Sequence, residues 1–302
     1  MWFVLSLIAM LCWSGSDLFS KIACQGERDK YSHLKMVTAV GIVMGLHAAY
    51  EVFFNGIEFN LEVVFQYMPV SILYIASMTL GYLGLRYIEL AISSPICNSS
   101  GALVAILCFA FGFTDELKTI QIVAIAVVCL SVIALGVVEV IEDEESRQIR
   151  QAQASRQYKK TFMALALPIA YAILDALGTF GDGIVLQKLD EDSANAAYEF
   201  TFLIFGIVAF IYVKFVKHES YLPREEGPKF LGAICETAGQ FAYIYAISDT
   251  EHLALSAPMI ASYCLISVIW GHVFLKEKLS PGRYVIIFIA LIGIGILGFY
   301  DA

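Results

Sequence analysis

Four carboxylic acids lie inside segments of this sequence that are otherwise apolar. They are Asp17, Asp175, Glu199 and Glu236. An ionisable side chain in the hydrocarbon region of a membrane is energetically costly, so such groups usually face the interior of a helix bundle or water. Lysine and arginine fall mostly near segment ends, where their charged heads can reach the interface. Acids without counterions need protons, water or an external cation, so all four are predicted to bind substrate or couple protons.

Each acid also has a structural explanation, and the sequence leaves both open. Asp17 could be partly exposed at a helix end, and Asp175 could bond to a hydroxyl group of a neighbouring helix. Glu199 is close enough to a segment end to lie at the membrane interface. Glu236 is flanked by small residues such as Gly232 and Gly239, which permit close approach of another helix or of a substrate.

Aromatic residues give a second signal in the same segments. A ring face attracts a cation by about 0.5–2 kcal/mol, so acids among aromatic walls would suit an amine or a quaternary ammonium group. Tyrosine and tryptophan also gather at membrane interfaces, which is the alternative explanation. The residues predicted to line a cavity are Trp13, Tyr82, Asn98, Tyr171, Tyr243 and Tyr263.

The elements that must position these residues are membrane-spanning helices. Apolar residues make up 59% of the 302 positions, charged residues make up 16%, and the mean hydropathy is +0.73. A spanning helix needs about 20 mostly apolar residues. Ten such segments are predicted, at roughly 2–22, 36–54, 67–90, 94–113, 119–139, 162–186, 195–213, 230–247, 253–275 and 284–300. The first runs directly from the N-terminus without a basic leader, so no cleavable signal is expected.

The distribution of basic residues predicts the orientation. Of the 19 lysine and arginine residues, all except Lys118 and Lys188 lie around the odd-numbered connections between the ten segments. Because basic residues mark the cytoplasmic side, both termini are expected to be extracytoplasmic and the long polar connection at 142–160 to be cytoplasmic. The cell (plasma) membrane is the expected location.

The connection at 142–161 divides the segments five and five. Several features of residues 1–141 recur in order in residues 162–302: Trp13-x-x-x-Asp17 as Tyr171-x-x-x-Asp175, Pro95 as Pro258, Asp115-Glu116-Leu117 as Glu277-Lys278-Leu279, and Gly136 as Gly298. A five-helix unit that occurs twice must take opposite membrane orientations, because five is odd. The predicted fold class is therefore an all-α membrane protein of ten transmembrane helices in a 5+5 inverted repeat, whose site lies near the midplane.

The sequence resembles the EamA-like drug/metabolite transporter superfamily over essentially its whole length. The resemblance rests on Trp13-Ser14-Gly15-Ser16 followed by Lys21, the tyrosine-rich segments GYLGLRYIEL and FAYIYAIS, the two prolines Pro95 and Pro258, and the acidic turns at Asp115 and Glu277. It implies a ten-helix carrier of small organic solutes, often an exporter, with a central cavity lined by spans 1, 3, 4, 6, 8 and 9. This sequence departs from the family in two ways: Asp17 stands where an apolar or aromatic residue is common, and the N-terminus is not basic.

The predicted function is secondary active transport of a small polar or cationic organic metabolite, as a proton-coupled carrier or an exchanger. Pro95, Pro258 and Gly178 are predicted to let helices bend during alternating access. No nucleotide-binding P-loop, GxSxG or HExxH motif occurs, so ATP drive and enzymatic activity are not expected. A channel or lipid-handling protein is the alternative.

The expected partners are a small-molecule substrate and membrane lipids, with no nucleic acid, cofactor or metal. His47 and His272 could assist proton movement, although packing is the commoner role. Gly41-x-x-x-Gly45 and the glycines of the last span, Gly293, Gly295 and Gly298, could pack within one protomer or between two copies, which leaves a homodimer open.

Overall fold

The described part of the chain is helical and contains no strand. The structure is a computed structural model that describes residues 1–24, 29–57, 60–113, 117–141, 162–248, 250–279 and 281–300. The predicted linker at 142–161 and the predicted turn at Asp115 lie outside these residues. The long apolar runs of the sequence thus form helices, which satisfy their own backbone hydrogen bonds in a membrane.

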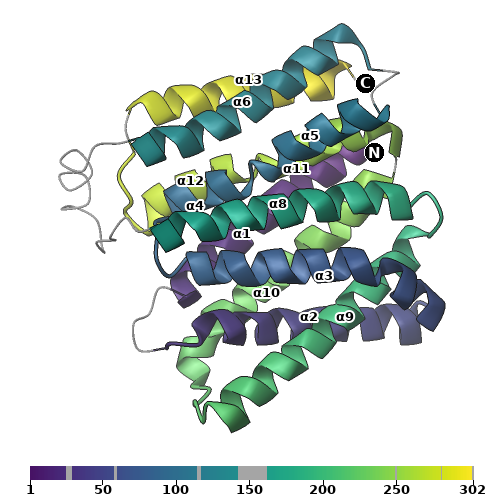
Figure 1. Ribbon diagram of the computed structural model, residues 1–302, viewed down its shortest axis with the longest axis vertical. Helices are drawn as coiled ribbons and strands as arrows, with labels where there is room; N and C mark the ends of the chain where they lie inside the picture. The colour runs from purple at the N-terminus through teal and green to yellow at the C-terminus, as the bar shows by residue number, and fades with distance from the viewer. Residues whose placement is uncertain are drawn as a thin grey trace.

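The first half of the chain forms α1 (Trp2–Cys24), α2 (Ser32–Phe54), α3 (Leu61–Gly84), α4 (Leu90–Cys97), α5 (Ser100–Phe111) and α6 (Thr119–Ile141). The second half forms α8 (Phe162–Val185), α9 (Glu191–Ile211), α10 (Pro223–Ser248), α11 (Leu253–Ala261), α12 (Cys264–Phe274) and α13 (Pro281–Tyr300). A π-helical turn, Tyr212–Val216, extends α9, and a 3₁₀ turn, Thr250–His252, precedes α11. Figure 1 shows these helices side by side.

Nine segments among the described residues are long and apolar enough to cross a membrane, counting α4 with α5 and α11 with α12 as one segment each. The tenth helical segment is α10, which carries polar residues along its length, among them Glu225, Glu226, Glu236 and Gln240. The structure therefore has the predicted helices, with some shifted ends. The predicted segment 94–113 begins earlier, at Leu90, and the predicted segment 230–247 begins at Pro223, because proline is favoured at the first helical position.

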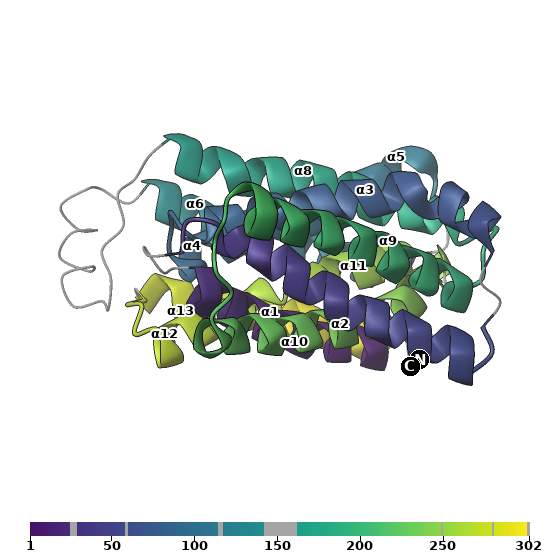
Figure 2. The same ribbon diagram turned by 90° about the horizontal axis from the view of Figure 1, so that it is seen from below.

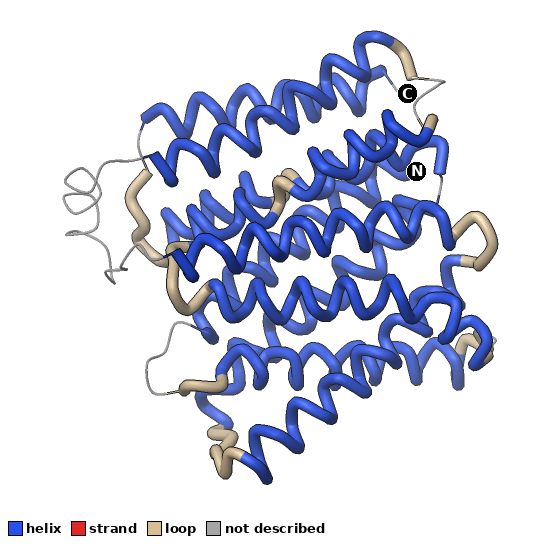
Figure 3. Tube along the Cα trace, in the orientation of Figure 1, coloured by secondary structure: helices blue, strands red, loops and turns tan. Residues whose placement is uncertain are grey.

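Two spans are interrupted near their middle. The break between α4 and α5 falls at Asn98 and Ser99, and the break between α11 and α12 falls at Ser262 and Tyr263 (Figure 3). Each break follows a proline inside the preceding helix, Pro95 in α4 and Pro258 in α11. A proline lacks the backbone N–H that continues the hydrogen-bond ladder, so the helix is weakened at these two corresponding places.

The helices of the two halves pack in pairs. α1 packs against α10, α3 against α8, α2 against α9, and α6 against α13. Glycine allows α2 and α9 to approach closely, because a Cβ atom on Gly41 would lie only 2.7 Å from the carbonyl oxygen of Phe202. Gly45 likewise faces Leu203 of α9. The Gly41-x-x-x-Gly45 face therefore packs within the protomer.

The chain termini and the central connection lie at opposite ends of the bundle. α1 begins and α13 ends at one end, whereas α6 ends and α8 begins at the opposite end (Figure 1). Seen from below, α3, α5 and α8 form one layer and α1, α10 and α12 form another (Figure 2). The space between these helices contains the polar side chains described next.

Candidate functional site

A central cavity with about 920 Å³ of space between atoms lies among helices from both halves of the chain. Its walls come from α1, α3, the broken span α4–α5, α8, α10 and α11, with Tyr198 of α9 and Tyr263 at the break before α12. The three acids Asp17, Asp175 and Glu236 line it, as do all the aromatic residues and Asn98 for which cavity lining was predicted: Trp13, Tyr82, Tyr171, Tyr243 and Tyr263.

Asp17 of α1 is held by both interrupted spans. Its Oδ2 atom accepts hydrogen bonds from the hydroxyl groups of Ser94 at 2.5 Å and Ser267 at 2.7 Å. Ser94 belongs to α4 and Ser267 belongs to α12. The acid is therefore a point where the two halves meet, and its Oδ1 atom has no hydrogen bond from a described residue.

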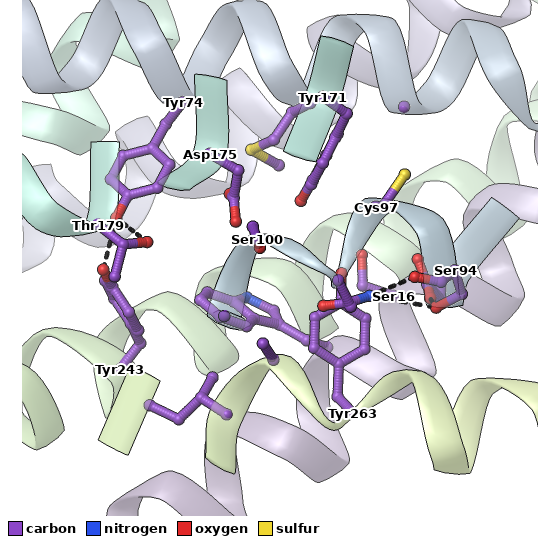
Figure 4. A pocket seen from close by; sticks show the side chains of 18 of the residues that line it. Ser16, Tyr74, Ser94, Cys97, Ser100, Tyr171, Asp175, Thr179, Tyr243 and Tyr263 are labelled. Carbon is purple, nitrogen blue, oxygen red and sulfur yellow. Dashed lines mark hydrogen bonds between the residues drawn. The ribbon is translucent and has the colours of Figure 1, made fainter. Parts of the chain in front are cut away.

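Glu236 and Asp175 place two more carboxyl groups at the cavity, from α10 and α8. Glu236 of α10 accepts a hydrogen bond from the Ser16 hydroxyl group of α1 at 2.6 Å. Asp175 of α8 lies near Ser100 of α5 and Tyr171, one turn earlier on its own helix (Figure 4). All three carboxyl groups are only partly buried, which is consistent with a position at the cavity surface.

Aromatic rings surround the acids. The ring centroid of Trp13 lies 5.0 Å from that of Tyr243 and 5.8 Å from that of Tyr263. A Cβ atom on Gly239 would lie 2.4 Å from the indole ring, so glycine at this position lets Trp13 lie directly against α10. Figure 4 shows Tyr171, Tyr243 and Tyr263 on different sides of the same space. Ring faces near carboxylates form a surface suited to a cation.

The cavity walls also present hydrogen-bond donors. The indole nitrogen of Trp13, the hydroxyl group of Tyr82 and the amide nitrogen of Gln240 are buried and have no hydrogen-bond partner among the described residues. Buried polar atoms normally have a partner, because an unsatisfied one costs about 1–3 kcal/mol. A bound solute with acceptor groups would satisfy these three donors.

No lysine, arginine or histidine is among the described residues that line the cavity. Buried basic side chains elsewhere in the bundle contact other groups. Lys21 donates to the carbonyl oxygen of Leu85 at 2.7 Å and to that of Ile88, at the end of α3. Lys35 and Lys229 form buried ion pairs that join α2, α10 and the connection after α1. In these pairs Asp29 lies 3.0 Å from Lys35, and Glu226 lies 3.3 Å from Lys229.

Glu199 is not among the cavity-lining residues, and its location differs from that of the other three acids. Its carboxylate lies 2.8 Å from His47 Nδ1, between α9 and α2, and also accepts a hydrogen bond from Asn195. His47 lies 3.7 Å from Glu51, one turn later on α2. Glu199 is fully buried in this pair. The other histidine considered from the sequence, His272, contacts the carbonyl oxygen of Glu277.

Sequence reasoning missed Asp182, which is a fully buried acid of α8. It lies next to the cavity wall without lining it, and it is bonded to three tyrosines. A signal was present, because Asp182 follows Asp175 by seven residues and so shares its helix face. Of the serines that bind the cavity acids, Ser94 and Ser267 carry no distinguishing spacing, and Ser16 belongs to the motif Trp13-Ser14-Gly15-Ser16, for which no binding role was predicted.

Comparison with known proteins shows what the chain is similar to. No curated protein sequence matches the chain. Among 26 matching chains of solved structures is one described only as the crystal structure of a protein, with 11% sequence identity and a TM-score of 0.64. The similarity covers 97% of this chain and 94% of that one, and it shows a shared fold. Residues 162–299, most of the second half of the chain, match the model of the EamA-like transporter family.

Proposed function

We propose that this protein is a secondary active transporter that moves a small polar or cationic organic solute, coupled to protons or by exchange. The observation that carries the proposal is the cavity between the two halves, where Asp17, Asp175 and Glu236 face aromatic rings with no basic residue among the described lining. A cationic group would meet the carboxylates, and acceptor atoms of the solute would meet the unpartnered donors. Proton and solute would compete for the same three acids.

An inverted repeat would explain how such a cavity opens to each side in turn. The packing pairs support it. In such a repeat α8 corresponds to α1 and α10 corresponds to α3, and both equivalent pairs are in contact: α1 with α10, and α8 with α3. The contacts of α5 with α11 and of α4 with α12 correspond in the same way. Rocking of one repeat against the other around a midplane site is the usual motion of such carriers. The interrupted spans α4–α5 and α11–α12 would bend during this motion.

Transport by purified protein in proteoliposomes tests the proposal. Three radiolabelled probes represent three classes of solute: choline for quaternary ammonium, glucose for neutral solutes and lactate for carboxylates. An imposed pH gradient is the driving force, and a pH-sensitive dye inside the vesicles reports proton movement. We expect saturable choline uptake against its gradient, with proton movement in the opposite direction.

Other results would contradict the proposal in identifiable ways. Conductance that does not saturate with solute would favour a channel, and flux of lipid alone would favour a lipid-handling protein. Saturable transport of lactate but not of choline would support a carrier function and contradict the proposal that the solute is cationic. Protein-free vesicles and the Asp17→Asn variant are the controls, because Asp17 is bonded to both interrupted spans and lines the cavity.

A further inference from the structure

A cluster of hydroxyl groups surrounds Asp182 at one end of the cavity. Tyr67 and Tyr74 of α3 donate hydrogen bonds to Asp182 Oδ1 and Oδ2, the second at 2.7 Å. Tyr243 of α10 donates to Oδ2 at 2.8 Å. Tyr74 also contacts the hydroxyl groups of Thr179, at 2.9 Å, and of Tyr243. The cluster therefore joins α3, α8 and α10 through one carboxyl group.

The cluster lies between the cavity and the end of the bundle. Tyr74, Thr179 and Tyr243 line the cavity (Figure 4). Asp182 and Tyr67, which are hydrogen-bonded to this group, do not line the cavity and are fully buried. Asp182 is three residues from the last residue of α8, and Tyr67 is six residues from the first residue of α3. The distribution of basic residues predicts that this end is extracytoplasmic. Asp175, Thr179 and Asp182 share one face of α8, so they form a polar line from the cavity to this end.

The cluster around Asp182 has one hydroxyl hydrogen fewer than it has contacts between oxygen atoms. Tyr67, Tyr74, Tyr243 and Thr179 supply one hydroxyl hydrogen each, and the carboxylate supplies none. These four hydrogens serve five contacts within the cluster. A proton on Asp182 supplies the fifth hydrogen, so all five contacts can then be hydrogen bonds. The protonated acid therefore satisfies all five contacts, whereas the ionised acid leaves one contact without a hydrogen.

The surroundings contain no described cation that would fix Asp182 as an anion. α3 contributes Tyr67 and Tyr74, α9 contributes Tyr198 through its contact with these two tyrosines, and α10 contributes Tyr243. On α8 the nearest charged group is Asp175, two turns away. From α11, the Leu253 side chain packs against the adjacent Gly183. The groups facing Asp182 are therefore hydroxyl groups, a second acid and apolar side chains.

We infer that Asp182 is a proton-relay residue that passes the coupling proton between the extracytoplasmic side and the acids of the cavity without contacting the solute. This inference rests on the proposed proton-coupled transport. In the relay, the proton leaves Asp182 Oδ2 for the Tyr74 oxygen as the Tyr74 hydrogen moves to Thr179. The Thr179 hydrogen then passes to an acceptor in the cavity, where Asp175 lies one turn away. One proton is transferred in total, and both hydroxyl residues remain neutral.

Infrared difference spectroscopy tests the proton on Asp182 without a transported solute. Purified protein is titrated with acid and base while the C=O stretch of protonated carboxyl groups is recorded. We expect one band to disappear in Asp182→Asn but to remain in Asp192→Asn, a matched control that removes an exposed aspartate also bonded to a tyrosine, Tyr245. In Tyr67→Phe, which keeps the carboxyl group and removes one donor, the same band should move to higher frequency. If neither Asp182→Asn nor Tyr67→Phe changes the spectrum, Asp182 does not exchange a proton and the inference is wrong.

Transport separates the relay from solute binding. Choline uptake driven by a pH gradient needs net proton movement, whereas choline exchange at equal pH does not. We expect Asp182→Asn to reduce driven uptake at least tenfold more than exchange, and Asp175→Asn to reduce both alike. Equal losses of the two activities in Asp182→Asn would mean a structural role and overturn the relay. Absence of choline transport in the unaltered protein would instead count against the proposed function, and the infrared result would still decide whether Asp182 exchanges a proton.

Discussion

The cavity acids differ from ordinary buried acids in how they are held. Asp17 and Glu236 accept hydrogen bonds from serine hydroxyl groups, Asp175 lies near Ser100 and Tyr171, and none of the three acids has a described ion pair. Hydroxyl donors stabilise a carboxylate without neutralising its charge. The charge therefore remains available to a cation or a proton that enters the cavity. Glu199 contrasts with these three, because His47 lies within hydrogen-bond distance of its carboxylate.

Neutral substitutions of the cavity acids should weaken solute binding. In Asp175→Asn and Glu236→Gln, the KM for choline in proteoliposomes should rise about 10-fold or more, because a hydrogen bond to a charged group contributes about 1.5–3 kcal/mol. The pH dependence of transport should also be lost. Glu225→Gln, at an exposed position on α10, is the control and should leave both unchanged. Normal KM values and a normal pH profile in both cavity variants would remove these acids from the mechanism.

Glu277 gives a pH effect on stability outside the spans. It lies in the connection between α12 and α13, where its carboxylate accepts hydrogen bonds from the backbone N–H groups of Leu90 and Ala91 at 3.0 and 2.9 Å. Burial raises the pKa of Glu277 above its usual value of 4.5, although Lys21 opposes the shift. The folded state therefore keeps this proton to higher pH than the unfolded state, so its contribution to stability is full below pH 4.5 and declines as pH rises.

The measurement is the melting temperature of Glu277→Gln and of the unaltered protein in detergent, at pH values below and above 4.5. The unaltered protein should lose its advantage over the variant as the pH rises above 4.5. An advantage that grows with pH would show that the ionised carboxylate is the stabilising form, contrary to this expectation.

At the scale of elements, the two interrupted spans form the contact on which the cavity depends. α5 packs against α11 and α4 packs against α12. The two spans approach closely at Gly101, where a Cβ atom would lie 2.6 Å from the Cβ atom of Ala261 and 3.1 Å from the Cα atom of Pro258. These neighbours are backbone or short side-chain atoms, so they cannot move without shifting a helix. Glycine at this position therefore fixes the separation of the two spans.

Gly101→Ala should consequently destabilise the protein. Overpacking of a well-packed interior costs about 1–3 kcal/mol, which should lower the melting temperature measured in detergent. Gly295→Ala is the matched control, because Gly295 lies in α13, where an added Cβ atom would have no described neighbour within 4 Å. That variant should be neutral or slightly more stable, since alanine is the better helix former. Equal melting temperatures for the two variants would mean that the spans adjust freely at Gly101.

At the scale of the whole molecule, the ends of the helices constrain the topology. α1 begins and α13 ends at one end of the bundle, and α6 ends and α8 begins at the other (Figure 1). The chain thus crosses the bundle an odd number of times before the central connection and an odd number after it. Two halves of this kind have opposite orientations, as the proposed inverted repeat requires.

Cysteine labelling tests which end is cytoplasmic. In a background without native cysteines, Ser146→Cys in the central connection should not react with an impermeant maleimide added to intact cells, and should react once the cells are permeabilised. Asn55→Cys, at an exposed position between α2 and α3, should react in intact cells. The reverse pattern would place both termini in the cytoplasm and would move the Asp182 cluster to the cytoplasmic end.

The sequence by itself determined the helical class, the approximate positions of the helical segments and the family resemblance. These depend on local properties: the length of each apolar run, the prolines at Pro95 and Pro258, and short motifs such as Trp13-Ser14-Gly15-Ser16. Helix formation in a membrane is enforced by the need to satisfy backbone hydrogen bonds within each segment, so apolar length alone predicts it. The cost of an intramembrane charge likewise marked Asp17, Asp175 and Glu236 as residues to consider.

Only the tertiary structure decided which acids share one cavity. Glu199 and Glu236 have similar apolar surroundings in sequence, yet His47 approaches the first from α2, whereas the second lies at the cavity wall beside Ser16. The role of Asp182 depends on tyrosines that are 61 to 115 residues away along the chain. Such contacts are set by how the helices of the two halves pack, and a pattern within one helix specifies its buried face but not the partner that this face meets.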